Sequence, residues 1–200
     1  KALEGERGVL PKKQHLLPPL SNNIKCGNSL IGYDIFEPPS QLLLRGASTP
    51  KQSPSPLAGE GKGEGEFSDE TKSRINPFDW NSKTAGFGEI MNPSQSPLDK
   101  GGSKGGFDVV IGNPPYVRIQ AMKEWAPVEV ELYKTKYKTA NTGSYDIYVV
   151  FVEKGLSLLK KRGHLGYILP HKFFQAQYGE PLRKLITDSK SLLKIVDFTD

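Results

Sequence analysis

The stretch from residue 107 to residue 118 constrains this chain most, because an apolar run there ends at two consecutive prolines. It reads Phe-Asp-Val-Val-Ile-Gly-Asn-Pro-Pro-Tyr-Val-Arg. Residues 109–111 form a short apolar run, which is typical of a buried strand. Pro114 and Pro115 have fixed φ angles and donate no backbone hydrogen bond, so the strand must end before them. An open α/β sheet places its chemistry where such strands end.

The four residues after this strand, Asn113 to Tyr116, can hold an aromatic amine. The Asn113 side-chain oxygen and the Pro114 carbonyl are two acceptors, and the prolines fix the direction of the carbonyl. Two acceptors match the two hydrogens of an exocyclic amino group and draw the nitrogen lone pair out of conjugation. Tyr116 offers a flat face on which a planar ring can stack. The pattern therefore favours attack of an amine on an electrophilic methyl group over the alternative, a simple tight turn.

Helix and strand patterns alternate from this point onward. Three strands are expected, at residues 107–111, 165–169 and 193–198. A long, partly helical loop at 117–143 and two helices, at 146–162 and 181–189, connect them. Basic residues 160–162 suit the end of the first helix, with Gly163 as its cap, and Asp146 is expected to cap its start. This order predicts an α/β fold with a doubly wound, mostly parallel sheet.

Two glycine-rich stretches interrupt this pattern. Residues 41–74 and 92–106 each contain Ser-Pro-Leu, then lysine-containing glycine-rich sequence, then phenylalanine. They have little to bury, so we predict that both are disordered insertions. They would interrupt a partial catalytic domain at residues 21–200, which residues 1–20 would connect to a missing N-terminal part.

Composition excludes several classes of protein. The chain has 200 residues, one cysteine, three histidines and a net charge of +5. A single cysteine forms no internal disulfide and fits a reducing, cytoplasmic location. No apolar run approaches the roughly 20 residues of a membrane helix, and the histidines lack metal-ligand spacing, so we expect neither a membrane nor a metal partner. The mild positive charge is compatible with nucleic acid.

The tetrapeptide Asn-Pro-Pro-Tyr resembles the catalytic motif of amino-methyltransferases that use S-adenosylmethionine. Further segments resemble the adenine-specific (N6) DNA methyltransferases of type IIG restriction-modification systems. These segments are residues 23–32, 145–148 with 151–154, 163–170, 178–184 and 195–198. The resemblance covers residues 21–40 and about 75–200. It implies part of the catalytic domain of such an enzyme, in the methyltransferase fold.

The resemblance also implies roles for individual residues. Asn113 and Pro114 would hold the target amine while Tyr116 stacks on an adenine flipped out of double-stranded DNA. Asn28 and Phe151 would contact the adenine of S-adenosylmethionine, although a turn-forming asparagine and a core aromatic remain equally open. The main cofactor-binding loop is expected upstream of this chain.

The segment after the tetrapeptide is basic and is a candidate for contact with DNA phosphates. Its cations are Arg118, Lys123, Lys134, Lys136 and Lys138. An exposed, solvated surface is the alternative.

The residue before the single cysteine bears on the type of methyl transfer. Cys26 follows a lysine and not the proline typical of cytosine C5 methyltransferases, which argues against that chemistry. Two alternatives stay open. One is a protein-glutamine or RNA amino-methyltransferase, and the other is an inactive piece of an interrupted methyltransferase gene.

Overall fold

The structure is a computed structural model, which describes residues 23–36, 67–93, 105–141 and 143–198. The strands are β1 (Phe107–Gly112) and β2 (Leu159–Tyr167). The α-helices are α2 (Asp69–Ile75), α3 (Gly88–Met91), α4 (Ile119–Trp125), α5 (Pro127–Lys136), α6 (Tyr148–Leu158) and α7 (Glu180–Asp188). Short 3-10 helices are η1 (Tyr33–Phe36), η2 (Lys138–Ala140), η3 (His171–Phe174) and η4 (Gln177–Gly179).

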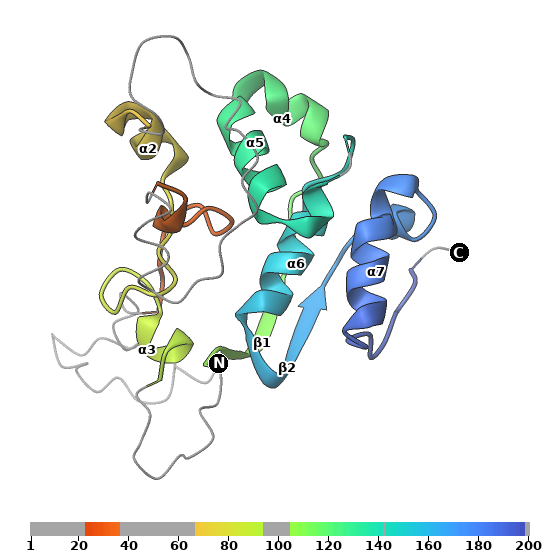
Figure 1. Cartoon of the computed structure of the whole chain (residues 1–200). Coiled ribbons are helices and arrows are strands. Elements are labelled where there is room, and N and C mark those ends of the chain that lie inside the picture. Colours follow the sequence, from red (N-terminus) through yellow and green to blue (C-terminus); the bar gives the residue numbers. More distant parts are fainter. Residues whose placement is uncertain (1–22, 37–66, 94–104, 142, 199–200) are drawn as a thin grey trace, which may run out of the picture.

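The two strands lie side by side and parallel, and α6 connects them. Val109 pairs with His164 and Gly112 pairs with Tyr167, so both strands end at the same edge. Helix α6 packs against both strands, and α7 lies beyond β2 (Figure 1). This confirms β1 and the parallel strand–helix–strand unit. A doubly wound sheet needs more strands than the two that the described residues form, so the complete sheet stays a prediction.

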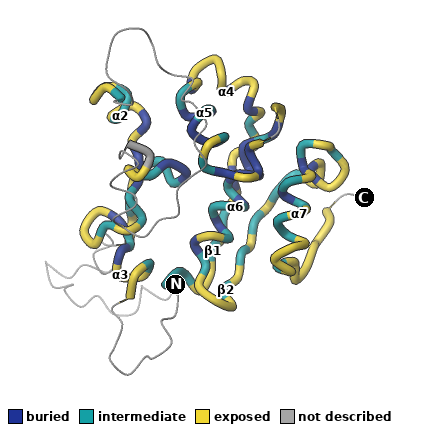
Figure 2. The backbone as a smooth tube through the Cα atoms, viewed as in Figure 1, coloured by how far each residue is buried: buried dark blue, intermediate teal, exposed yellow. Residues whose placement is uncertain are grey.

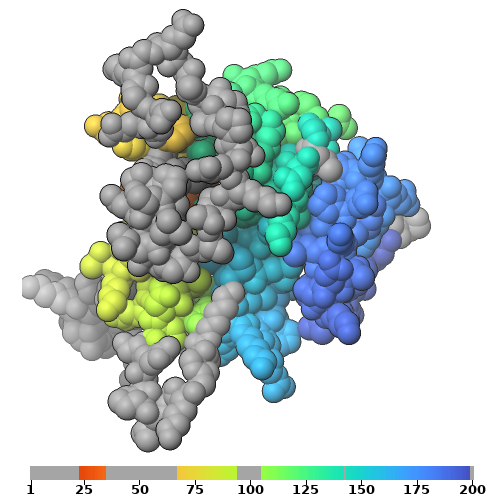
Figure 3. All heavy atoms as spheres, in the orientation of Figure 1, coloured from red at the N-terminus to blue at the C-terminus, as the bar shows by residue number. Residues whose placement is uncertain are grey.

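Helix α6 is the centre of the core. Buried residues concentrate in α5 and α6 (Figure 2), and the first three residues of α6, Tyr148 to Val150, are fully covered. The segments from α4 to α7 form one continuous surface (Figure 3). In contrast, β1 exposes 58% of Val109 and 84% of Ile111 on the face away from α6. The described residues therefore cover one face of the two-stranded sheet.

The prediction that the first long helix runs to residue 162 is wrong. Helix α6 ends at Leu158, and residues 159–167 form β2, which begins with an irregular pairing to β1. Lys160 forms an ion pair with Asp108 of β1, instead of lying at a helix end. Gly163 is not a helix cap either. A Cβ at this position would lie 2.8 Å from the Phe107 carbonyl oxygen, so the glycine permits close packing of the strands.

The expected cap at the start of this helix is also wrong. Asp146 makes no side-chain cap, and the cap position belongs to Ile147. The Asp146 carboxylate instead accepts a hydrogen bond from Tyr178. A tertiary contact has replaced the local one.

The strand expected at 193–198 does not form in the described structure. Leu193 and Phe198 are 77% and 85% exposed, and residues 191–198 follow α7 without forming a helix or a strand. A strand requires a neighbouring strand, which local sequence cannot supply. Helix α7, at 180–188, confirms the second predicted helix.

Helix α2 corrects the end of the first expected insertion. Ser68 caps the helix by accepting from the Thr71 backbone N–H at 3.2 Å, and Ile75 is buried. Arg74 makes two hydrogen bonds to the Glu129 carboxylate on α5, at 2.9 and 3.1 Å. These contacts order residues 69–75 despite the glycine-rich sequence before them. Residues 1–20, 41–66 and 94–104 lie outside the described residues.

Within the described ranges, no helix combines the length and the apolarity that crossing a bilayer requires.

Candidate active site

The Asn-Pro-Pro-Tyr tetrapeptide lies directly after β1, at the edge where both strands end. The Ile168 backbone N–H, just after β2, donates to the Gly112 carbonyl at 3.3 Å and extends the pairing to this point. Pro114 is buried, whereas Asn113 and Tyr116 are exposed. The buried proline anchors the turn, and the two polar side chains face outward.

Tyr116 folds back over this edge. Its hydroxyl oxygen lies 2.6 Å from Asn113 Oδ1 and 3.0 Å from the Ile168 carbonyl oxygen. Both neighbours are acceptors, so the single hydroxyl proton can serve either one. The structure therefore brings the Asn113 and Tyr116 side chains into direct contact, which the sequence did not predict.

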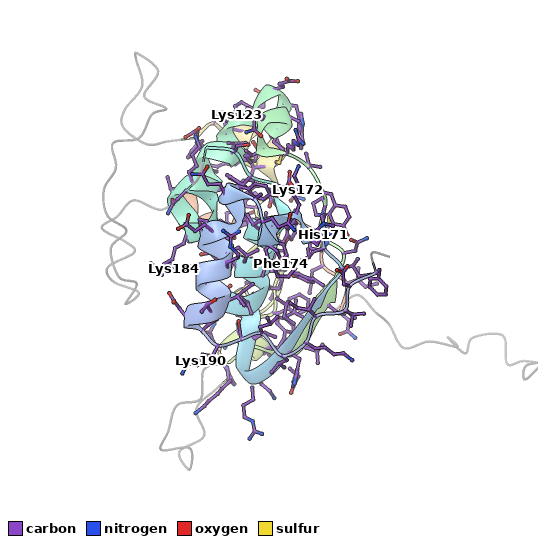
Figure 4. All side chains as sticks on the ribbon, turned by 90° about the vertical axis from the view of Figure 1, so that its right-hand side faces the viewer. Lys123, His171, Lys172, Phe174, Lys184 and Lys190 are labelled. Carbon is purple, nitrogen blue, oxygen red and sulfur yellow. The ribbon has the colours of Figure 1, made fainter. Side chains whose placement is uncertain are left out.

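A row of aromatic rings runs from the half-exposed Tyr116 through the buried Tyr148 and Phe173 to the exposed Phe174. Tyr116 meets Tyr148 edge to face, with ring centroids 6.3 Å apart, and Tyr148 meets Phe173 at 6.2 Å. Phe173 stacks on Phe174 at 4.2 Å, and Phe174 is 41% exposed (Figure 4). Burial, followed by the hydrogen bond to Tyr178, raises the pKa of the Tyr148 hydroxyl, which stays protonated at neutral pH.

A cavity of about 250 Å³ adjoins the tetrapeptide. Phe151, a predicted cofactor contact, lines it together with Asn113 and Pro114. Trp80 forms another wall, and its indole N–H donates to the Ser29 carbonyl at 3.0 Å. Sequence reasoning missed Trp80, because residues near 80 reach this cavity only through tertiary pairing. The aromatic residues Phe78 and Trp80 are the sequence feature that could have indicated a role for this segment.

Asn28, the other predicted cofactor contact, does not line this cavity. Its Oδ1 accepts from the Leu30 backbone N–H at 3.1 Å, and its own N–H donates to the Asn76 carbonyl at 2.6 Å. These contacts fit the turn-forming alternative. The next residue, Ser29, reaches the cavity wall.

Lys154 places a cation at the same cavity. Its ammonium lies 5.2 Å from the centroid of the Trp80 ring. Burial lowers the pKa of Lys154 to about 8; Lys136 lowers it further and Asp34 opposes the shift. The lysine is therefore partly neutral near physiological pH, which is unusual for this side chain.

The predicted DNA-contacting cations separate into two groups. Lys134 pairs with Glu131 at 2.5 Å, and Lys136 pairs with Asp34 at 3.0 Å. Arg118 and Lys138 are exposed and make no ion pair with the described residues. Pairing therefore leaves three of the five predicted cations, Arg118, Lys123 and Lys138, without an ion pair in the described residues.

Another basic face was not predicted as a unit. Figure 4 looks onto it and labels Lys123, His171, Lys172, Phe174, Lys184 and Lys190. The four lysines are exposed, and none forms an ion pair within the described part of the chain. They come from α4, η3 and the region of α7, so their grouping depends on the fold.

Comparison with known proteins gives a family match over most of the chain. Residues 39–200 match the Eco57I restriction-modification methylase family. The type II restriction enzyme and methyltransferase RM.Eco57I of Escherichia coli is 42% identical over 92 residues, which is 46% of this chain and 9% of that protein. The type II methyltransferase M.PaeR7I of Pseudomonas aeruginosa is 39% identical over 97 residues, which is 48% of this chain and 16% of that protein.

A third relative gives a similar result. The type II methyltransferase M.BstVI of Geobacillus stearothermophilus is 43% identical over 94 residues, which is 46% of this chain and 16% of that protein. The chain thus spans less than a fifth of the length of these three relatives. No solved structure matches the chain. The family match extends over the strands, the tetrapeptide and the helices around it, and the chain therefore belongs to the Eco57I restriction-modification methylase family.

Proposed function

We propose that this chain carries the catalytic core of a restriction-modification DNA methyltransferase. The enzyme transfers a methyl group from S-adenosylmethionine to the N6 amino group of an adenine flipped out of double-stranded DNA. One observation carries the proposal. The exposed Asn113 and Tyr116 side chains meet at the end of β1, beside a cavity with aromatic walls.

The tetrapeptide supplies what the amine requires. Asn113 Oδ1 and the Pro114 carbonyl accept the two amino hydrogens, which leaves the nitrogen lone pair free to attack. The Tyr116 hydroxyl occupies Asn113 Oδ1 in this structure, but it has the Ile168 carbonyl within 3.0 Å as another acceptor. The hydroxyl can therefore turn to Ile168 when the amine arrives. No strong base is required, because the proton leaves after methyl transfer.

The cavity residues fit the adenine ring of the cofactor. Trp80 and Phe151 offer aromatic surface, and Asn113 to Pro115 close the side toward the amine. Aromatic walls favour a flat, apolar ring. Bound S-adenosylmethionine supplies an electrophilic methyl group on its sulfonium, and Asn113 borders both this cavity and the exposed substrate side.

The relatives favour DNA over the alternative substrates. Two of them are named as type II methyltransferases, and the third is named as a type II restriction enzyme and methyltransferase. A paired adenine keeps its amino group inside the duplex, so the base must leave the stack before Tyr116 can reach it. The exposure of Tyr116 at 49% provides an open surface for such a base.

We assign the DNA backbone to the face labelled in Figure 4. Lys172 follows Ile168 by four residues, so it lies within about 14 Å of the tetrapeptide edge. Like Lys123 and Lys184, it forms no ion pair with a described acidic residue. Lys134 and Lys136, in contrast, are already paired.

The test is product identification with the natural gene product. Duplex DNA is incubated with S-adenosylmethionine, digested to nucleosides and analysed by mass spectrometry. We expect N6-methyladenine, and we expect Asn113→Ala to slow its formation by roughly 100–1,000-fold, as for loss of a transition-state hydrogen bond. Asn141→Ala is the matched control, because Asn141 is an exposed asparagine outside the tetrapeptide and does not line the cavity. Formation of N4-methylcytosine, or methylation of protein alone, would contradict the proposal.

A further inference from the structure

A hydrogen-bonded group of side chains lies behind the Tyr116 ring, and the proposed reaction gives it no role. It consists of Tyr148 at the start of α6, Tyr178 in η4, and Asp146. The two tyrosine hydroxyl oxygens lie 2.9 Å apart, and the Tyr178 hydroxyl donates to Asp146 Oδ2 at 2.9 Å. Tyr148 and Tyr178 are 30 residues apart in sequence, so the fold brings them together.

The direction of these hydrogen bonds follows from the available protons. A carboxylate accepts and does not donate, so the single proton of Tyr178 is committed to Asp146. Tyr148 must then donate to the Tyr178 oxygen. The bonds run in one direction, from Tyr148 through Tyr178 to Asp146, and both hydroxyl protons have an acceptor.

Tyr148, held in place by these hydrogen bonds, contacts the ring of Tyr116. Its side chain is fully buried, and its ring stands at 87° to that of Tyr116. Phe173 packs against the same tyrosine at 67°. Edge-to-face contacts are directional, so a movement of the Tyr148 ring changes the favourable angle for Tyr116.

The backbone holds the same segments together. Hydrogen bonds of 2.9 Å join residues 117–119 to residues 145–147. Gly179, next to Tyr178, approaches Phe173 so closely that a Cβ would overlap the Phe173 carbonyl oxygen. Tyr116 thus presents its half-exposed ring from a support built by three separate segments.

We propose that Asp146, Tyr178 and Tyr148 are positioning residues that set the angle of the Tyr116 ring for stacking on the target base. The proposal rests on the proposed function, which identifies that base as the flipped adenine. Without the anchor, the Tyr148 ring can shift and the Tyr116 ring can tilt. The base is then held less accurately over Asn113, and methyl transfer slows.

Four variants break or preserve this network in different ways. Tyr178→Phe removes the central link, whereas Tyr148→Phe removes the first donor and keeps the Tyr178–Asp146 bond. Asp146→Asn retains an acceptor oxygen, whereas Asp146→Leu does not. Tyr145→Phe is the matched control, because this buried hydroxyl has no hydrogen-bond partner in the described structure.

The first measurement reads the ring directly and does not depend on activity. We introduce 3-fluorotyrosine at position 116 of the natural gene product and record ¹⁹F NMR spectra without DNA. We expect a shifted and broadened resonance in Tyr178→Phe, Tyr148→Phe and Asp146→Leu. Asp146→Asn and the Tyr145→Phe control should keep the wild-type resonance.

The second measurement reads stacking and catalysis in unlabelled protein. With 2-aminopurine at the target position, we expect brighter emission from the base in Tyr178→Phe, since weaker stacking quenches it less. On an adenine duplex, the single-turnover rate should fall about 3–10-fold, as for a small misplacement of the reacting group, with little change in DNA affinity.

The outcomes separate this inference from the proposed function. If Tyr178→Phe and Tyr148→Phe keep the wild-type ¹⁹F resonance, the inference is overturned, even if their melting temperatures fall. If wild-type protein methylates no adenine, the proposed function fails, while the ¹⁹F spectra still decide whether the network fixes the ring.

Discussion

The Tyr116 hydroxyl lies 2.6 Å from Asn113 Oδ1, the oxygen that we assign to the target amine. The stacking residue and the acceptor are therefore linked before any substrate binds. This hydrogen bond orients the Asn113 oxygen toward the exposed ring and holds the amide in place. Because the Ile168 carbonyl is 3.0 Å from the same hydroxyl, the tyrosine can release Asn113 without losing a hydrogen bond.

Substitutions at Tyr116 should separate the ring from the hydroxyl. We expect Tyr116→Phe to keep the single-turnover methylation rate within about threefold of wild type, because the amine replaces the hydroxyl at Asn113 and the ring still stacks. Tyr116→Ala should be much slower, since stacking contributes about 1–3 kcal/mol per base. A Phe variant as slow as the Ala variant would show that the hydroxyl, and not the ring, is the essential group.

The aromatic cavity should control cofactor affinity. Phe151→Ala and Trp80→Ala each remove one of its walls, so we expect the Kd for S-adenosylmethionine to rise about tenfold for either variant. Isothermal titration calorimetry measures this change. Phe174→Ala, an exposed aromatic outside the cavity, is the control and should bind the cofactor as wild type does. Unchanged affinity in both cavity variants would place the cofactor elsewhere.

The two basic regions should differ in their contribution to DNA binding. Lys172→Gln with Lys184→Gln removes two unpaired charges, so we expect the slope of log affinity against log salt to fall by about two. Lys134→Gln with Lys136→Gln removes two paired charges and should change it less. Fluorescence anisotropy at several salt concentrations measures both slopes. If the Lys134/Lys136 variant changes the slope more than the Lys172/Lys184 variant does, the DNA backbone contacts residues 134–138 instead.

Removing the hydroxyl from two buried tyrosines should change the free energy of unfolding in opposite directions. The Tyr145 hydroxyl is buried with no hydrogen-bond partner in the described part of the chain, so we expect Tyr145→Phe to raise the free energy of unfolding by about 1 kcal/mol. Tyr137 donates to the Leu30 carbonyl at 2.6 Å, so Tyr137→Phe should lower it by about 1 kcal/mol. Urea denaturation measures both changes. Destabilisation by Tyr145→Phe would reveal a partner for that hydroxyl.

Lys154 should make stability rise with pH. Its pKa falls from 10.5 in the unfolded chain to about 8 in the folded one, so between these values the unfolded state binds more protons. We therefore expect the free energy of unfolding to increase by roughly 1–2 kcal/mol between pH 7.5 and pH 9.5, relative to Lys154→Met. Above about pH 10, Tyr133 makes the free energy of unfolding fall with pH. The reason is that burial raises its pKa to about 12 in the folded protein, so the folded state keeps a proton that the unfolded state has lost. Parallel pH profiles for the two proteins would contradict this assignment.

Local pattern predicted the elements that depend on few distant contacts. Strand β1 and helix α7 formed where the spacing of apolar residues placed them. Helix α6 ends earlier than the pattern predicted. After Leu158 the chain pairs with β1 and Lys160 forms an ion pair with Asp108, so these residues form a strand. The sequence pattern alone cannot show such competition between a helix end and a strand partner.

The site followed the same rule. Sequence reasoning could propose Asn113, Pro114 and Tyr116 because they lie within one chemically distinctive tetrapeptide. It overlooked Trp80 and Tyr178, whose roles depend on pairings with residues 51 and 32 positions away. Such partners become visible when the segments are folded together.

The direct pairing of residues 28–31 with residues 76–80 has a consequence for changes in chain length. Hydrogen bonds from Asn28 to Asn76, Phe78 to Ile31 and Trp80 to Ser29 fasten these segments to each other. These hydrogen bonds therefore fix the position of Trp80 at the cavity. The number of residues between the two segments does not. Each doubling of the number of residues between two fixed ends costs only about 0.6 kcal/mol. We therefore expect a change in the number of residues between positions 37 and 66 to leave the shape of the cavity at Trp80 unchanged.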